Sequence, residues 1–442
     1  MLYLLKNKDD ITTIFTLAIP VIMENILQAF IGTVDIYFAG SINDNAIAAI
    51  GVTNLVINLF IVFFTAISMG TSAIVARNFG KGEMDKVKEA VIESVFLGII
   101  ISLVVGIINI IFYKQILKAC GASNEILQLA IPYYVIVSVP IIFLCLSLIL
   151  SSCLRSTKDT KTPMIATALA NILNIILNIL FMKMNMGITG LALATTISRC
   201  VDMIILMIKL KLDNIEIKLN KSSLKSGKDT LKSIIKIGAP AGMEKLIMRL
   251  GQIVYNSMII SIGVPSFVAH NIAGNIESYT YIPALGFGVA TATLVGITLG
   301  IGDSEKTKEI VYLADRITII FMMIVGINLF IFAPEIVKMF TKTKEVQLMV
   351  IHVLRLISLF QSFIAITQIF TSALQGAGDT KFPMYATLIG IWGIRVGIGY
   401  LLGVILSFGL FGVWMAYALD ITIRGILLII RFNYGKWKSI II

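Results

Sequence analysis

Two acidic residues lie inside the first long apolar stretch of the chain, residues 11–38. Glu24 and Asp35 are eleven positions apart, and Gln28 lies between them. Because eleven residues of an α-helix return to within about 20° of the starting direction, the three side chains share one stripe of a helix. An ionisable side chain in the hydrocarbon core of a membrane costs at least a few kcal/mol unless it has a partner, a proton or a cation. The stripe therefore predicts a site that handles cations or protons.

Three asparagines in a later apolar stretch form a second polar pattern. Asn171, Asn174 and Asn178 are spaced i, i+3 and i+7, so they lie on one face of a helix. Amide oxygens, like carboxylates and hydroxyls, are the hard ligands that replace water around a small cation. Buried asparagine also joins helices by hydrogen bonds in membranes. We expect the packing role for Asn171 alone and the ligand role for the set.

The composition sets the class of protein that must position these groups. The chain has 442 residues, of which 57% are hydrophobic and 14% charged, and its apolar runs recur along the whole length. This pattern predicts a polytopic membrane protein embedded in a lipid bilayer. The net charge of +11 comes from Lys and Arg in the short segments between the runs, as the positive-inside rule requires. We therefore expect no nucleic-acid partner.

Cysteine and histidine give no indication of a disulfide framework or a zinc site. The four cysteines and two histidines lack the spacing of metal ligands. The first ten residues, MLYLLKNKDD, carry no cleavable signal pattern, so we expect the stretch from Ile11 to be a retained span.

Apolar runs of about twenty residues predict roughly twelve transmembrane helices. The distribution of Lys and Arg places both termini in the cytoplasm of a protein of the cell membrane. The predicted spans are 11–38, 46–76, 90–112, 126–152, 163–182, 187–210, 232–260, 266–299, 310–333, 346–374, 383–404 and 409–431.

The two halves of the chain are copies of each other. LAIPVIME from Leu17 recurs as IGAPAGME from Ile237, GKGEMDKVKEAV from Gly80 as GIGDSEKTKEIV from Gly300, and LRSTKDTKTPM from Leu154 as LQGAGDTKFPM from Leu374, each 220 positions later. Three matches at one offset indicate a repeat architecture. We expect an N-lobe at 1–210, a cytoplasmic linker at 211–231 and a C-lobe at 232–442. With six spans in each copy, the lobes should be related by a pseudo-two-fold axis along the membrane normal.

The joint order of these motifs resembles the multidrug and toxin extrusion (MATE) family. The resemblance rests on P-x-x-x-E in the first span, V-D-x-x-x-x-G from Val34 to Gly40, ARNFGKG from Ala76 to Gly82, and the D-T-K-x-P loops. It covers nearly the whole chain, in both copies. It implies an all-α antiporter of twelve helices in two lobes that expels organic cations in exchange for sodium or protons.

The same resemblance implies roles for particular residues. Asp35, Asn174, Asn178 and Thr195 match a cation-coupling site of the N-lobe, where sodium or a proton would bind. Many relatives carry an aspartate at the position of Asn178, so this chain has one carboxylate fewer there. In the C-lobe, Glu244 matches a glutamate that handles cation or substrate, and Glu277 lies in an N-I-E-S segment found in the family. We assign Glu24 and Gln28 to the same substrate or cation group.

The repeat itself separates the two lobes. Glu24 corresponds to Glu244, whereas Asp35 corresponds to Tyr255, so the main ion site should be N-terminal. Glu244 and Glu277 then either attract a cationic substrate or form buried pairs with Lys245 and Arg249. For the remaining charged residues inside the spans we expect ion pairs within a lobe; they are Arg199, Asp202, Arg395, Asp420 and Arg424.

The predicted function is export of lipophilic organic cations in exchange for sodium or protons, by alternating access of two lobes. We expect a monomer with no cofactor and no catalytic residues. A flippase for a lipid-linked precursor is the alternative, and it would need an Arg- and Lys-rich cavity for pyrophosphate. An intramembrane enzyme should show a His, Asp or Ser constellation and a channel a filter motif, and the sequence has neither.

Overall fold

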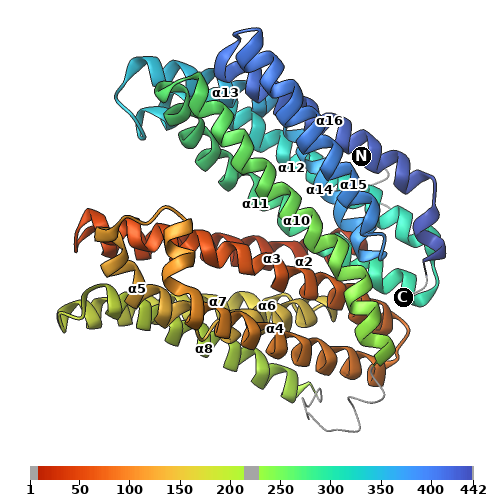
Figure 1. Ribbon diagram of the computed structural model, residues 1–442. Coiled ribbons are helices and arrows are strands. Elements are labelled where there is room, and N and C mark those ends of the chain that lie inside the picture. The colour runs from red at the N-terminus through yellow and green to blue at the C-terminus, as the bar shows by residue number, and fades with distance from the viewer. Residues whose placement is uncertain (1–7, 214–227, 441–442) are drawn as a thin grey trace. The chain divides into compact units, whose positions relative to one another are not determined.

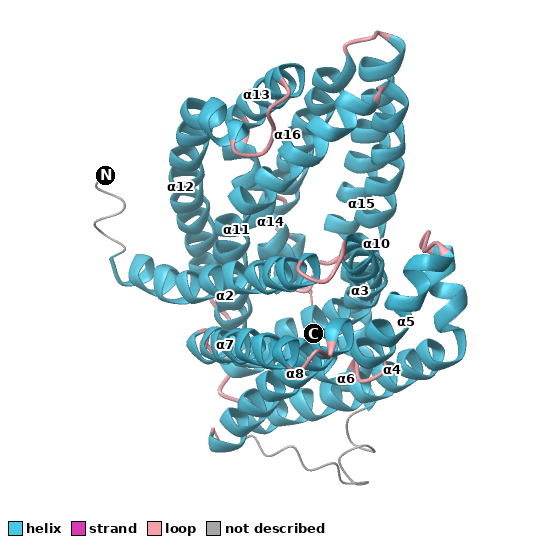
Figure 2. Cartoon of the chain, turned by 90° about the vertical axis from the view of Figure 1, so that its left-hand side faces the viewer, coloured by secondary structure: helices cyan, strands magenta, loops and turns pink. Residues whose placement is uncertain are grey.

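The computed structural model describes residues 8–213 and 228–440 of the chain. Over these residues the protein is helical and contains no strand, as Figure 1 and Figure 2 show. The predicted all-helical fold is therefore confirmed. Most of the linker predicted at 211–231 lies outside the described residues.

The helices follow one another with short turns between them. In the first half of the chain they are α2 (Lys8–Gly40), α3 (Asp44–Gly80), α4 (Met84–Ala119), α5 (Asn124–Ser138), α6 (Ile142–Ser156), α7 (Lys161–Lys183) and α8 (Gly187–Leu212). In the second half they are α10 (Lys228–Ile262), α11 (Val264–Ile301), α12 (Ser304–Lys338), α13 (Lys344–Leu359), α14 (Gln361–Gly376), α15 (Lys381–Leu388) and α16 (Gly409–Asn433), with the η segments Ile389–Ile398, Leu401–Ile405 and Lys436–Ser439.

In length and hydropathy, helices in the described part of the chain match eleven of the twelve predicted membrane spans; the exception is the span predicted at 232–260, which lies in α10. Nine stretches in the described part of the chain are long and apolar enough to cross a bilayer, and two bent helix pairs bring the number to eleven. At 35 residues, α10 is also longer than the ~30 Å of a bilayer core requires. Polar side chains cap some of these helices: those of Asn43 and Asp303 accept hydrogen bonds from the first turns of α3 and α12.

Two predicted spans are broken, which corrects their description as continuous helices. α5 and α6 meet at 45° within the span predicted at 126–152, and α13 and α14 meet at 55° within the span predicted at 346–374. Pro140 lies at the first break, where it cannot donate a backbone hydrogen bond. The span predicted at 383–404 also departs from a regular α-helix, because the π-helical segments Ile389–Ile398 and Leu401–Ile405 follow α15.

The chain divides into two compact units. Unit 1 comprises Met1–Ile22 and Met243–Ile442, and unit 2 comprises Met23–Gly242. Both boundaries lie inside helices, α2 and α10, at repeat-equivalent positions 220 residues apart. The first part of α2 thus belongs to the unit that contains the second half of the chain, and the first part of α10 belongs to the other unit. The lobes expected from the sequence, which are separated only by the linker, do not include this exchange of helix segments.

Glycines allow the exchanged helix segments to pack closely within each unit. In unit 2, a Cβ built on Gly238 would lie 2.3 Å from the carbonyl oxygen of Ala66. In unit 1, a Cβ built on Gly286, the repeat equivalent of Ala66, would lie 3.0 Å from the carbonyl oxygen of Ala18, the repeat equivalent of Gly238. Only a residue without a side chain permits such an approach of two helix backbones.

Candidate functional site

The four residues assigned to a cation site lie together in unit 2. Asp35 on α2 is 5% exposed, and it accepts hydrogen bonds from Asn178 Nδ2 (3.2 Å, to Oδ1) and from the hydroxyl of Thr195 on α8 (3.1 Å, to Oδ2). Asn178 Nδ2 also donates to Asn174 Oδ1 at 3.0 Å, and Asn174 Nδ2 lies 3.4 Å from the Thr195 hydroxyl. Helices α2, α7 and α8 thus contribute to one closed hydrogen-bond network, which we call the Asp35 cluster.

The Asp35 cluster has chemistry suited to a small cation or a proton. Its direct partners for the carboxylate are neutral, and Asn178, which is fully buried, has an Oδ1 atom with no hydrogen-bond donor. An unpaired buried acceptor next to a buried carboxylate is stabilised by a positive charge or a donated proton. Arg199 is near enough to Asp35 to interact electrostatically but makes no ion pair with it in the described structure.

Asn171 does not belong to the Asp35 cluster. Its Nδ2 donates to the backbone carbonyl of Leu27 at 2.7 Å, which joins α7 to α2. This contact is the helix-packing role that we expected for Asn171.

Glu24 has a charged partner that the sequence pattern did not predict. Arg155 Nη1 lies 2.9 Å from both carboxylate oxygens of Glu24, and the Glu24 side chain is only 2% exposed. Gln28 Nε2 reaches Glu24 Oε1 at 3.4 Å. The stripe of Glu24, Gln28 and Asp35 therefore contains one carboxylate in an ion pair and one with neutral partners.

The repeat-equivalent Glu244 in unit 1 has neutral partners. Gln375 Nε2 donates to Oε2 at 2.9 Å, and the hydroxyl of Thr387 lies 3.2 Å from Oε1. Glu244 is 3% exposed. Among the described residues, neither Lys245 nor Arg249 comes within ion-pair distance of Glu244 or Glu277; Arg249 is exposed, and its Nη1 contacts Gln252 at 3.3 Å.

Glu277 lies in a second polar group of unit 1. It accepts a hydrogen bond from the Tyr417 hydroxyl at 2.5 Å, and the guanidinium of Arg395 stacks on the Tyr417 ring, 4.0 Å from its centroid. Arg395 and Arg424 both bind Asp420 Oδ2, at 2.6 and 3.0 Å. The predicted ion pairs of the last two spans are thus confirmed.

The ion pair predicted for the sixth span, between Arg199 and Asp202, is not formed in the described structure. Asp202 Oδ2 accepts a hydrogen bond from Ser147, and neither Asp202 nor Arg199 forms an ion pair in the described part of the chain. Asp202 interacts electrostatically with both Glu24 and Arg155.

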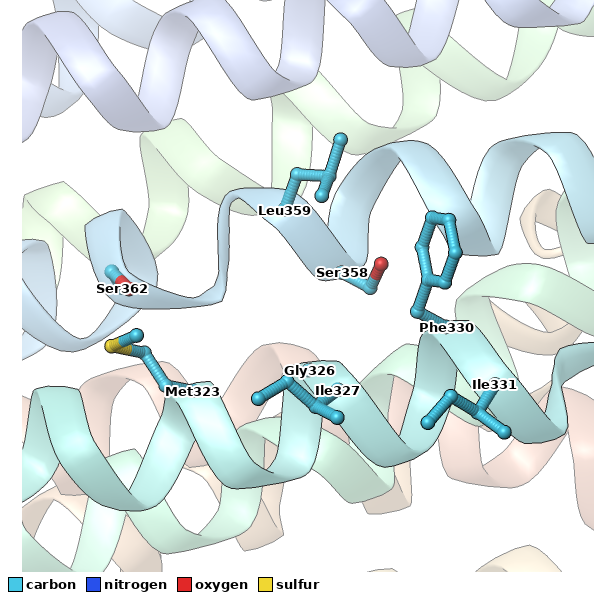
Figure 3. A pocket seen from close by; sticks show the side chains of 8 residues that line it. All are labelled: Met323, Gly326, Ile327, Phe330, Ile331, Ser358, Leu359 and Ser362. Carbon is cyan, nitrogen blue, oxygen red and sulfur yellow. The ribbon is translucent and has the colours of Figure 1, made fainter.

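A cavity of about 330 Å³ in unit 1 lies apart from all these carboxylates. Figure 3 shows that it opens between α12 and the break between α13 and α14, with Met323, Phe330 and Leu359 among its apolar lining residues. Its polar lining side chains are the serines Ser358 and Ser362. A cavity with this lining offers no charge for a cation.

In the described ranges, no three His, Cys, Asp or Glu side chains lie close enough together to hold a metal ion.

Comparison with known proteins shows one family over most of the chain. The MatE family profile matches residues 20–180 and 240–401. A probable multidrug resistance protein NorM of Thermotoga maritima is 30% identical over 96% of this chain and 92% of its own, and the uncharacterised transporter YisQ of Bacillus subtilis is 27% identical over 98% and 95%. A crystal structure of a MATE protein in the bent conformation covers 98% of this chain and 97% of that one, with a TM-score of 0.91 at 22% identity. An outward-facing multidrug resistance MATE transporter gives 0.90 at 23%, covering 97% and 96%. The chain therefore belongs to the MatE family, and it is a multi-pass membrane transporter of that family and not an enzyme.

Proposed function

We propose that this protein exports lipophilic organic cations in exchange for sodium or protons, by alternating access of its two units. The coupling ion binds at the Asp35 cluster: Asp35, Asn174, Asn178 and Thr195. The cationic substrate is attracted by Glu244 and Glu277 of the other unit. The protein lies in the cell membrane as a monomer with both termini in the cytoplasm.

One observation carries this proposal. Asp35 is a buried carboxylate in a membrane helix whose direct partners are neutral, and it lies beside an amide oxygen without a donor. Such a group is stable in hydrocarbon surroundings only with a proton or cation bound. A site that must hold an ion in one state and release it in another can couple that ion to transport.

Three arginines, unlike Arg199 and Arg249, have carboxylate partners in the described structure, which favours antiport over a lipid flippase. Arg155 binds Glu24, and Arg395 and Arg424 bind Asp420. These guanidinium groups are engaged with carboxylates of the same unit, so they are not available to neutralise a pyrophosphate.

The test is uptake of a fluorescent organic cation into inverted membrane vesicles, with a sodium gradient and a pH gradient imposed separately. Wild-type protein should accumulate the cation under one of the two gradients. Asp35→Asn should abolish this accumulation while the protein remains folded, because the amide cannot bind or release the ion.

The repeat provides a matched control for that variant. Tyr255 occupies the position equivalent to Asp35, and its hydroxyl donates to the carbonyl oxygen of Val413 at 3.0 Å. Tyr255→Phe should transport at close to the wild-type rate. Wild-type rates in Asp35→Asn would refute the assignment of the coupling site.

A further inference from the structure

The same buried glutamate occurs in both copies of the repeat with a different partner in each. Glu24 and Glu244 are 220 positions apart, and so are Arg155 and Gln375. Arg155 is the next-to-last residue of α6 in unit 2, and Gln375 is the next-to-last residue of α14 in unit 1. At one position of the repeat, therefore, the chain has exchanged a guanidinium for an amide.

The contacts at the two sites are closely similar in length. Arg155 Nη1 lies 2.9 Å from Oε1 and Oε2 of Glu24, and Gln375 Nε2 lies 2.9 Å from Oε2 of Glu244. Both glutamates are almost fully buried, at 2% and 3% exposure. The neighbouring threonine is also retained in the repeat, as Thr167 in unit 2 and Thr387 in unit 1, and both are buried.

The difference between the two sites is therefore one of charge. A guanidinium neutralises the carboxylate that it binds, whereas an amide donates a hydrogen bond and leaves the charge in place. Within the described residues, Glu244 has no Lys, Arg or His in ion-pair contact. A buried carboxylate without a counter-charge is strongly destabilised, so the Glu244 site lacks the cation that the Glu24 site contains as Arg155.

Glu244 also retains capacity for further hydrogen bonds. A carboxylate has two oxygens with about four acceptor positions in total. Gln375 occupies a position on Oε2 and Thr387 one on Oε1. Each oxygen can still accept one more donor, which is what a planar cation with two N–H groups requires.

We propose that Gln375 determines the head group that this site accepts: with an amide in place of the arginine, a guanidinium, amidinium or ammonium group of the exported cation takes the role toward Glu244 that Arg155 has toward Glu24. In this account Gln375 is a specificity-determining residue, because it orients Glu244 without neutralising it. This inference rests on the proposed export of organic cations and specifies their head group: cations with N–H donors are preferred over permanent cations without them. Because Glu244 is 3% exposed, the substrate reaches it only when the surrounding helices move.

The test is equilibrium binding to the full-length protein purified into lipid nanodiscs. The two probes are a fluorescent aryl-amidinium dye and tetraphenylphosphonium, which carries the same charge but no N–H donor. Wild-type protein should bind the amidinium at least about tenfold more tightly, the effect of one charge-assisted hydrogen bond or more. Gln375→Arg should lower the amidinium affinity by about tenfold or more, because the new guanidinium binds Glu244 as Arg155 binds Glu24.

Three further variants separate this role from a folding defect. Gln375→Asn keeps a neutral donor and should retain the preference for the amidinium. Glu244→Gln should lose the preference, and adding Gln375→Arg to it should have no further effect.

Equal wild-type affinities for the two probes would overturn the proposal, and so would an unchanged amidinium affinity in a folded Gln375→Arg protein. The proposed antiport has a separate failure: amidinium binding as predicted, but no response of transport to a sodium or pH gradient. That result would support the Glu244 site and refute the proposed coupling of transport to an ion.

Discussion

At the scale of single residues, the proposed function depends on positions where the two copies of the repeat carry different residues. Asp35 has the repeat-equivalent Tyr255, which donates to a backbone carbonyl and packs edge-on against His270. Arg155 has the equivalent Gln375, as described above. Through these two positions, unit 2 has a buried carboxylate with neutral partners and a glutamate paired with arginine, whereas unit 1 has a tyrosine in place of that carboxylate and a glutamate with neutral partners.

Asn178 provides a direct test of the Asp35 cluster. Its amide donates to Asp35, and its Oδ1 has no donor. Asn178→Asp adds a second negative charge within hydrogen-bond distance of the first, so sodium affinity should rise by about tenfold, or about 1.4 kcal/mol. Asn178→Leu removes the amide oxygen and should lower the affinity. Calorimetric sodium titration of the three purified proteins should give the order Asp, Asn, Leu; an unchanged affinity in Asn178→Asp would exclude Asn178 as a ligand.

Residue types and helical spacing were enough to predict the members of the Asp35 cluster, with Thr195 added by the family resemblance. They were not enough to predict the partner of Glu24. Arg155 lies near the end of α6, beside a motif that reads as a cytoplasmic turn, and 131 positions separate it from Glu24. The aligned repeats LRSTKDTKTPM and LQGAGDTKFPM nevertheless contain a signal, because the charged Arg155 aligns with the neutral Gln375.

At the scale of helices, close packing depends on glycine at the crossing of α3 with the first part of α10. A Cβ on Gly70 would lie 2.3 Å from the carbonyl oxygen of Ile234, whereas one on Gly51, in the same helix, would meet no atom within 4 Å. Gly70→Ala should therefore destabilise the protein by about 1–3 kcal/mol. Gly51→Ala should be neutral or stabilising by up to about 1 kcal/mol, because alanine favours the helix.

Thermal unfolding in detergent measures both glycine variants. The expected result is a lower midpoint for Gly70→Ala and an equal or higher one for Gly51→Ala. Equal midpoints for the two variants would show that the backbones at this crossing have room to separate without loss of stability.

The positions of the spans were predictable because hydropathy determines which segments can lie in a membrane. The interruptions were not, since a break of one to three residues leaves an apolar run intact. Pro140 gave a local signal for the first break, but Phe360, at the second, is as compatible with a helix as its neighbours. The π-helical segment around Arg395 likewise has no signature in apolar spacing.

At the scale of the whole molecule, the repeat predicted two copies but not the exchange of the first parts of α2 and α10 between units. Composition and hydropathy cannot show which copy a helix segment packs against. The boundaries after Ile22 and Gly242 place Glu24 and Glu244 just beyond the exchange point in each helix. The two glutamates are therefore at equivalent places in the architecture.

The proposed orientation in the membrane can be tested at two turns. Lys158 and Asn185 both have positive φ angles, and α7 separates them. With cytoplasmic termini, a cysteine at position 158 should be protected in intact cells from a membrane-impermeant maleimide, and one at 185 should be labelled. The four native cysteines are first replaced. The reverse labelling pattern would invert the topology.

The most direct test of the central claim is reversed coupling in proteoliposomes. A gradient of an organic cation is imposed, and the movement of sodium and of protons is measured at the same time. The account predicts that wild-type protein drives one of these ions against the direction of the organic cation, and that Asp35→Asn does not. Ion movement in the same direction as the organic cation, or unchanged counterflow in Asp35→Asn, would contradict it.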